Sequence, residues 1–140
     1  MDEFAFTRTA RNNSYEISVN NTDNIIIIAF LGLWDKTSQL EYYLDDIKSA
    51  LEKIESGFNL IIDLSLYKGS ISENIHLHVE AQNLASEAGL SRTVVILHDN
   101  PLLKITVEYI LQLSGINATF LSNFPTSLHW LTLFDNKKIV

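Results

Sequence analysis

The chain has no cysteine among its 140 residues. This absence excludes disulfide bonds, thiolate nucleophiles and metal sites with cysteine ligands, and it is consistent with a reducing compartment. Basic residues are also few, because ten Lys and Arg stand against 17 Asp and Glu, for a formal net charge of −7. Since these basic residues are scattered along the chain, we expect neither a nucleic-acid-binding surface nor a polybasic contact with anionic lipid.

Long apolar runs are missing as well. The longest, residues 25–31, is far shorter than the ~20 residues that a membrane-spanning helix needs. The first six residues have neither the basic start nor the apolar stretch of a secretion signal. We therefore expect a cytoplasmic protein without integral membrane insertion. Its length and its 46% hydrophobic content suit one domain with one sizeable core.

The spacing of apolar residues predicts the element order ββαβαβαβα. Strands are expected at residues 15–19, 25–31, 59–65, 93–97 and 118–121. Helices with an apolar stripe are expected at residues 37–56, 70–88 and 101–114, and from residue 125 onwards. This order predicts a single α/β domain with one mixed, mostly parallel sheet and packed helices. The domain is expected to span residues 14–135, after an N-terminal arm (1–13) and before a loose C-terminal tail (136–140).

The expected helix boundaries carry their usual signals. Capping boxes open the first two helices, at Ser38 with Glu41 and at Ser70 with Glu73. The first three helices each end at a glycine followed by an apolar residue, at Gly57-Phe58, Gly89-Leu90 and Gly115-Ile116.

The strand at residues 59–65 is expected to be central. Its apolar run, Leu60 to Ile62, has no polar face, so other elements must cover it on both sides. Asp63 and Ser65 stand where this strand leaves the core. The carboxyl end of a central strand is where open α/β sheets usually place ligands and switches.

Three stretches carry a family resemblance: Gly32-Leu33-Trp34-Asp35, then Gly57-Phe58-Asn59-Leu60-Ile61-Ile62-Asp63-Leu64-Ser65, and finally Phe120-Leu121-Ser122 with Leu128-His129-Trp130-Leu131. With them the chain resembles the STAS-like family, the relatives of the sporulation anti-sigma factor antagonist, over roughly residues 14–134. The resemblance is closer to the branch called sporulation protein AA-like. It implies the STAS-like fold and a protein partner.

In the antagonist family, a phosphorylatable serine stands at the start of the helix after the central strand, within an Asp-Ser-Ser-Gly-type motif. This chain lacks the motif and has Ser70 or Ser72 near that place. The resemblance thus points to a candidate partner or switch loop composed of Asp63, Ser65, Tyr67, Lys68, Ser70 and Ser72. Structural roles are the alternative, with Ser70 as a helix cap and with Asp63 and Ser65 as ties for the following loop.

The expected helix at residues 101–114 has two apolar stripes, whereas a helix packed on one sheet needs one. The second stripe must meet another part of the chain, another subunit or a bound apolar ligand. The candidate oligomer or ligand face comprises Trp34, Leu102, Ile105, Tyr109 and Leu113.

These patterns favour a non-catalytic interaction or regulatory module with a protein partner, including a homodimer. The alternative is a carrier of a small, lipid-like apolar ligand near Trp34 and Tyr109, because the sporulation protein AA-like branch has been likened to such carriers. No metal or cofactor is expected, since His76 and His78 fall on nearly opposite sides of their helix. An enzyme is the weakest hypothesis, because the sequence shows no nucleophile–base pair, although a pocket with strongly shifted titratable groups would favour one.

Overall fold

The structure is a computed structural model that describes residues 5–36, 40–70 and 72–139. Its strands are β1 (Thr7–Arg11), β2 (Tyr15–Asn20), β3 (Ile25–Trp34), β4 (Asn59–Ser70), β5 (Arg92–Ile96) and β6 (Ala118–Leu121). Its helices are α1 (Tyr43–Leu51), α2 (Ile75–Glu87), α3 (Pro101–Ser114) and α4 (Phe124–Ile139), and a 3-10 turn (Ser72–Asn74) precedes α2.

The strands form one six-stranded sheet in the order β1-β2-β3-β4-β5-β6. The β1–β2 and β2–β3 pairs are antiparallel, and the three pairs from β3 to β6 are parallel. This arrangement confirms the predicted α/β fold with a mixed, mostly parallel sheet. The parallel half follows from the βα units, because the helix of each unit returns the chain to the end of the sheet at which the previous strand began.

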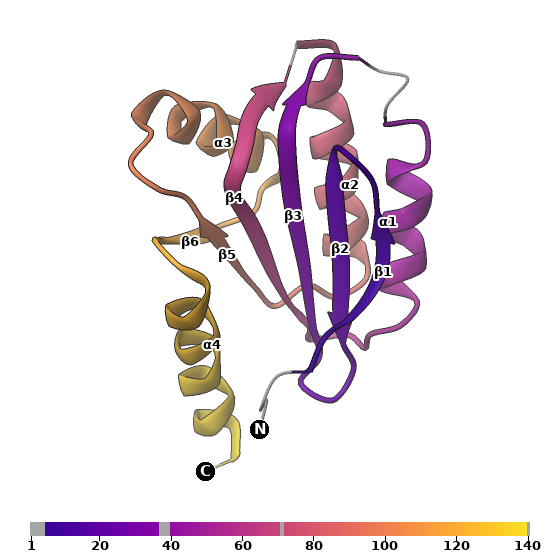
Figure 1. Ribbon diagram of the computed structural model, residues 1–140. Helices are drawn as coiled ribbons and strands as arrows, with labels where there is room; N and C mark the ends of the chain where they lie inside the picture. Colours follow the sequence, from indigo (N-terminus) through magenta and orange to yellow (C-terminus); the bar gives the residue numbers. More distant parts are fainter. Residues whose placement is uncertain (1–4, 37–39, 71, 140) are drawn as a thin grey trace.

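Helices pack on both faces of the sheet (Figure 1). Apolar side chains of α1, α2 and α3 join those of β2, β3 and β4 in the larger core. Leu131 of α4 packs on the opposite face against Ile25, Ile61, Val94 and Ile96. Figure 1 shows α4 near β5 and β6, so the front of β2 and β3 is not covered by any of the described helices.

Three predicted boundaries are corrected. Residues 7–11 of the expected arm form the edge strand β1, which pairs with β2 through its backbone and needs no apolar pattern of its own. β4 continues to Ser70, five residues beyond its predicted end, because it remains paired with β3 past an irregularity in register. At the C-terminus, α4 continues through most of the expected tail to Ile139.

The helix ends were predicted better than the helix starts. Gly89 and Gly115 have positive φ and stand at the ends of α2 and α3, as the predicted glycine stops require. Gly57 also has positive φ, but α1 ends earlier, at Leu51 with Glu52 as its C-cap, so the stop predicted for this helix is wrong. The Ser70–Glu73 capping box is wrong, since α2 begins at Ile75 after Asn74 and no side chain caps it. Ser70 is held in the strand by pairing with Trp34. α1 begins only at Tyr43, and Ser38 of the other predicted box lies outside the described residues.

Candidate functional site

A cluster of buried rings lies between the sheet and helices α1 and α2. Phe30 and Trp34 of β3, Tyr43 of α1 and Tyr67 of β4 have edge-to-face or tilted contacts with ring centroids 4.8 to 6.4 Å apart. Aromatic rings in such geometries stabilise one another beyond the area that they bury. The cluster therefore fixes the carboxyl-terminal halves of β3 and β4 against the helices.

His78 of α2 completes this cluster. Its side chain is buried, and its imidazole stacks on the indole of Trp34 with centroids 4.6 Å apart and planes at 14°. Burial lowers the pKa of His78 to about 4, so the ring is neutral at pH 7. A neutral imidazole can accept a hydrogen bond at its unprotonated nitrogen.

Two hydroxyl groups meet the Nε2 atom of this imidazole. Tyr67 Oη lies 3.2 Å and Ser70 Oγ 3.1 Å from His78 Nε2, and the two hydroxyls also hydrogen-bond each other. Burial raises the pKa of Tyr67 to about 12, against an opposing effect of its hydrogen bond with Ser70, so the phenol keeps its proton at neutral pH. The structure thus brings a serine and a histidine within hydrogen-bond reach.

Further hydrogen bonds tie the cluster to the backbone. Trp34 Nε1 donates to the carbonyl oxygen of Ser14 at 2.8 Å, and Asn74 Nδ2 donates to the carbonyl oxygen of Trp34 at 3.0 Å. Asn74 is fully buried immediately before α2. The start of α2 is therefore anchored to the end of β3.

The candidate switch loop is the second half of strand β4 followed by the 3-10 turn, which Ser72 begins. Tyr67 is buried and Ser70 half-buried in the ring cluster, whereas Ser65 and Lys68 are exposed and Asp63 is half-buried. Asp63 Oδ1 accepts hydrogen bonds from Ser65 N at 2.9 Å and from Ser65 Oγ at 2.6 Å. Tyr67 and Ser70 therefore form an inner pair, whereas Ser65 and Lys68 lie at the surface and Asp63 is bonded to Ser65.

The two stripes of α3 have opposite surroundings. Val107, Ile110 and Leu111 are buried against the core. The second stripe is exposed, by 80% at Leu102, 64% at Ile105, 53% at Tyr109 and 52% at Leu113. Trp34, which the sequence grouped with this stripe, is fully buried in the ring cluster. The hypothesis of one ligand site near both Trp34 and Tyr109 is corrected accordingly.

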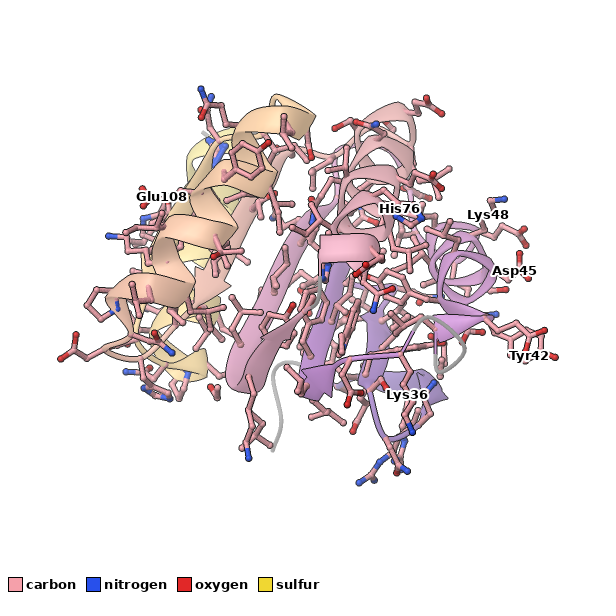
Figure 2. The ribbon with its side chains drawn as sticks, turned by 90° about the horizontal axis from the view of Figure 1, so that it is seen from above. Lys36, Tyr42, Asp45, Lys48, His76 and Glu108 are labelled. Atoms are coloured by element: carbon pink, nitrogen blue, oxygen red, sulfur yellow. The ribbon has the colours of Figure 1, made fainter. Side chains whose placement is uncertain are left out.

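Seen from above, the three helices of the larger core stand in a row (Figure 2). α3 lies at one end and α1, with its labelled Asp45 and Lys48, at the other, and α2 packs against both. The exposed stripe of α3 is therefore well separated from α1.

An open groove of about 620 Å³ lies at the carboxyl ends of β5 and β6. His98, Asp99 and Ser122 line it, and Lys104 Nζ lies 5.1 Å from the ring centroid of Phe120. Within the described ranges, no three His, Asp or Glu residues gather in a way that could hold a metal ion. None of the helices among the residues that the structure describes is long and apolar enough to cross a membrane.

Sequence reasoning missed His78, Gln82 and Asn74, which are all buried. The apolar residues of this helix predict a buried face of Leu77, Ala81, Leu84, Ala85 and Ala88. The buried residues of α2 are His78, Ala81, Gln82 and Ala85, so the prediction includes the two alanines and omits the two polar residues. The small residues Ala81 and Ala85 were the available signal for this. Small side chains let a helix pack close to a sheet, and polar residues on the same side of the helix then become buried as well.

No protein-family model matches the chain, and no curated protein matches it. Among solved structures, it is similar to an uncharacterised protein from Shewanella loihica of the DUF3478 family with a SpoIIAA-like fold. The TM-score is 0.57 at 15% identity, over 94% of this chain and 98% of that one. It is also similar to the anti-sigma factor antagonist SpoIIAA in its unphosphorylated form, with a TM-score of 0.50 at 13% identity, over 97% and 100% of the two chains. The chain therefore has the SpoIIAA-like, STAS-like fold that the sequence predicted.

Proposed function

We propose that the protein is a non-catalytic interaction module that binds a second protein molecule through the outer face of α3, defined by Leu102, Ile105, Tyr109 and Leu113. The observation that carries this proposal is the exposure of these four side chains, each more than half accessible. Their spacing of three, four and four residues places them on one side of the helix. A regulatory role is supported by the fold, which an anti-sigma factor antagonist shares.

The size of the face also supports docking. Together the four side chains expose on the order of 500 Å² of apolar surface, which is near the upper end for a monomer and typical of an interaction site. A stable interface buries roughly 800 Å² on each partner, so residues around the stripe must take part as well.

The occupant that we propose is a second copy of this chain. The net charge of −7 makes two copies repel each other, so a contact between them is favoured where few acidic groups are exposed. The stripe itself carries no charge and is flanked by Thr106 and Gln112, whereas Glu108, three residues after Ile105, is exposed at its margin on the side of α3 away from α2 (Figure 2). An antiparallel pair of α3 helices would place Ile105 of one copy opposite Tyr109 of the other.

The Ser70–His78 pair is the observation closest to catalysis, and we propose a structural role for it. Both hydrogen-bond partners of His78 Nε2 are hydroxyl groups, and the imidazole is fixed by the stack on Trp34. In a catalytic triad, a third group such as a carboxylate orients the imidazole and stabilises the imidazolium that forms when the imidazole takes the serine proton. Trp34 provides orientation by stacking and no negative charge.

Sedimentation equilibrium over a wide concentration range tests the proposal. We expect the wild type to dimerise, and Ile105→Lys to raise the dissociation constant at least about tenfold, because it buries a charge in an apolar contact. Tyr42→Lys is the matched control, since Tyr42 is 63% exposed but precedes α1 and should leave dimerisation unchanged. A wild type that stays monomeric at every concentration, or an Ile105→Lys variant that dimerises normally, contradicts the proposal.

A further inference from the structure

The two edge strands of the sheet differ in their side chains. β1 carries Arg8 and Arg11, and its pairing with β2 is irregular between Arg8 and Ala10. Charged side chains and irregular pairing are common means by which proteins keep an edge strand from pairing with another chain. β6 has the sequence Ala-Thr-Phe-Leu, without a charge, and its pairing with β5 is regular. The edge at β6 therefore lacks the protection that β1 has.

The backbone of β6 offers hydrogen-bonding groups at this edge. β6 pairs with β5 alone, and Leu97 N donates to the carbonyl oxygen of Leu121 at 3.0 Å, so Leu121 faces β5. Successive residues of a strand direct their N–H and carbonyl groups to opposite sides. Phe120 and Ala118 therefore direct theirs away from β5, toward a strand added outside β6.

Hollows lie at both ends of β6. The groove of about 620 Å³ described above includes Phe120 and Leu121, and a second hollow of about 320 Å³ includes Ala118 and Thr119. The groove lies beside the start of α3, and the second hollow lies beside Trp130 of α4. At about 3.3 Å per residue, the length of β6 separates them by roughly 10 Å. A compact ligand fills one of the two, whereas an extended chain along β6 reaches both.

The charge at this edge is opposite to the net charge of the chain. Lys104 Nζ lies over the ring of Phe120 in the groove, and Arg92 lines the second hollow. Among the described residues, no carboxylate forms an ion pair with Lys104. Asp99 is the only acidic residue that lines either hollow within the same part of the chain. A segment with acidic side chains therefore complements this edge.

We propose that β6 and the two hollows form a docking site for an extended, acidic segment of a partner protein, which adds a strand to the sheet beside β6. Main-chain hydrogen bonds with Ala118 and Phe120 hold the segment, and its side chains enter the hollows. An acidic side chain beside Phe120 meets the ammonium group of Lys104. The occupant is an extended chain rather than a helix, because only an extended chain pairs with the free side of a strand.

This site is separate from the outer face of α3, and the inference goes beyond the proposed dimer. The outer face consists of Leu102, Ile105, Tyr109 and Leu113, and none of these residues lines either hollow. Dimerisation is measured without a peptide, so the failure of one proposal leaves the other standing.

A phage-displayed library of random octapeptides, selected on the full chain, supplies the probe. We expect the enriched peptides to combine Asp or Glu with β-branched residues. Fluorescence anisotropy then measures the dissociation constant of a synthetic, labelled copy. Lys104→Glu should raise this constant at least about tenfold. Lys53→Glu is the matched control, since Lys53 is also exposed but lines a hollow beside β1, and it should leave the constant unchanged.

Methylation of alternate amide nitrogens of the peptide tests the main-chain pairing separately. Only every second amide of an added strand faces β6. Methylation of that set should weaken binding at least about tenfold, and methylation of the other set should change it little. In NMR spectra of the protein, the peptide should shift the amide signals of residues 118–121 most.

Any of three results would overturn the proposal. The first is that no octapeptide is enriched above the background. The second is that the enriched peptides bind Lys104→Glu as tightly as the wild type, or bind equally well with either set of amides methylated. The third is that the amide signals of β6 shift with protein concentration in the absence of peptide, because the edge then pairs with a second copy of the chain.

Discussion

The imidazole of His78 lies flat on the indole of Trp34, with ring centroids 4.6 Å apart and planes at 14°. This contact joins the first buried residue of α2 to the last residue of β3. Because Trp34 is fully buried and also donates to the Ser14 carbonyl, the stack holds together three segments that are far apart in the sequence.

The free energy of unfolding should depend on pH through His78. Burial lowers its pKa to about 4 in the folded protein, from an ordinary value of 6.5. The unfolded chain therefore takes up this proton first as the pH falls. The stabilisation is complete above pH 6.5 and is lost between pH 6.5 and pH 4, by about 3 kcal/mol in total.

Urea unfolding at several pH values measures this loss. His78→Gln should flatten the slope between pH 6.5 and pH 4, whereas His76→Gln, an exposed neighbour on the same helix, should keep it. An NMR titration in which the His78 ring takes up its proton near pH 6.5 in the folded protein would contradict the prediction.

A negative charge at Ser70 should disturb the fold as well as any partner contact. Ser70 Oγ is hydrogen-bonded to Tyr67 and to the neutral ring of His78, so Ser70→Asp should lower the free energy of unfolding by about 2 kcal/mol. Ser70→Ala removes only the hydrogen bonds and should lower it by about 1 kcal/mol. Chemical denaturation checks both values. As a control, Ser86→Asp, at an exposed position on α2, should change the free energy of unfolding by less than about 0.5 kcal/mol. Equal effects of the Asp variants at the two sites would show that Ser70 is not constrained by this network.

The indole of Trp34 should be required for full stability. Trp34→Phe removes buried volume and leaves the Ser14 carbonyl without its donor, so we expect a loss of about 2 kcal/mol in the free energy of unfolding. Thermal and urea unfolding measure this loss. A variant as stable as the wild type would mean that the ring cluster repacks freely around a smaller side chain.

The fold was predictable because its signals are local. Continuous apolar runs identified β3, β4 and β5, and the glycine stops Gly89 and Gly115 identified the ends of α2 and α3. β1 gave no such signal, since an edge strand such as Thr7–Arg11 pairs through backbone groups and needs few apolar side chains. The extension of β4 was also hidden, because Lys68 and Gly69 resemble a loop in sequence, whereas the strand continues through pairing of Gly69 and Ser70 with β3.

The candidate site was predictable only in part. The exposed stripe of α3 follows from helical spacing, so Leu102 and Ile105 could be identified from the sequence as members of one face. The contact of Ser70 with His78 depends on how α2 turns against β4, which spacing alone does not fix. The place of Trp34 could not be inferred either, since it depends on packing against residues from four elements besides its own strand.

Distances between spin labels test the central claim most directly, and the absence of cysteine allows a single label site to be introduced anywhere. With a label at Gln112→Cys, beside the outer face of α3, the account predicts a distance between copies of about 20 Å or less, because packed helices lie 8–10 Å apart. With a label at Lys48→Cys, at the far end of the row of helices, it predicts a much longer distance (Figure 2). The contradicting result is the absence of any coupling between copies labelled at Gln112→Cys, or a shorter distance between copies labelled at Lys48→Cys.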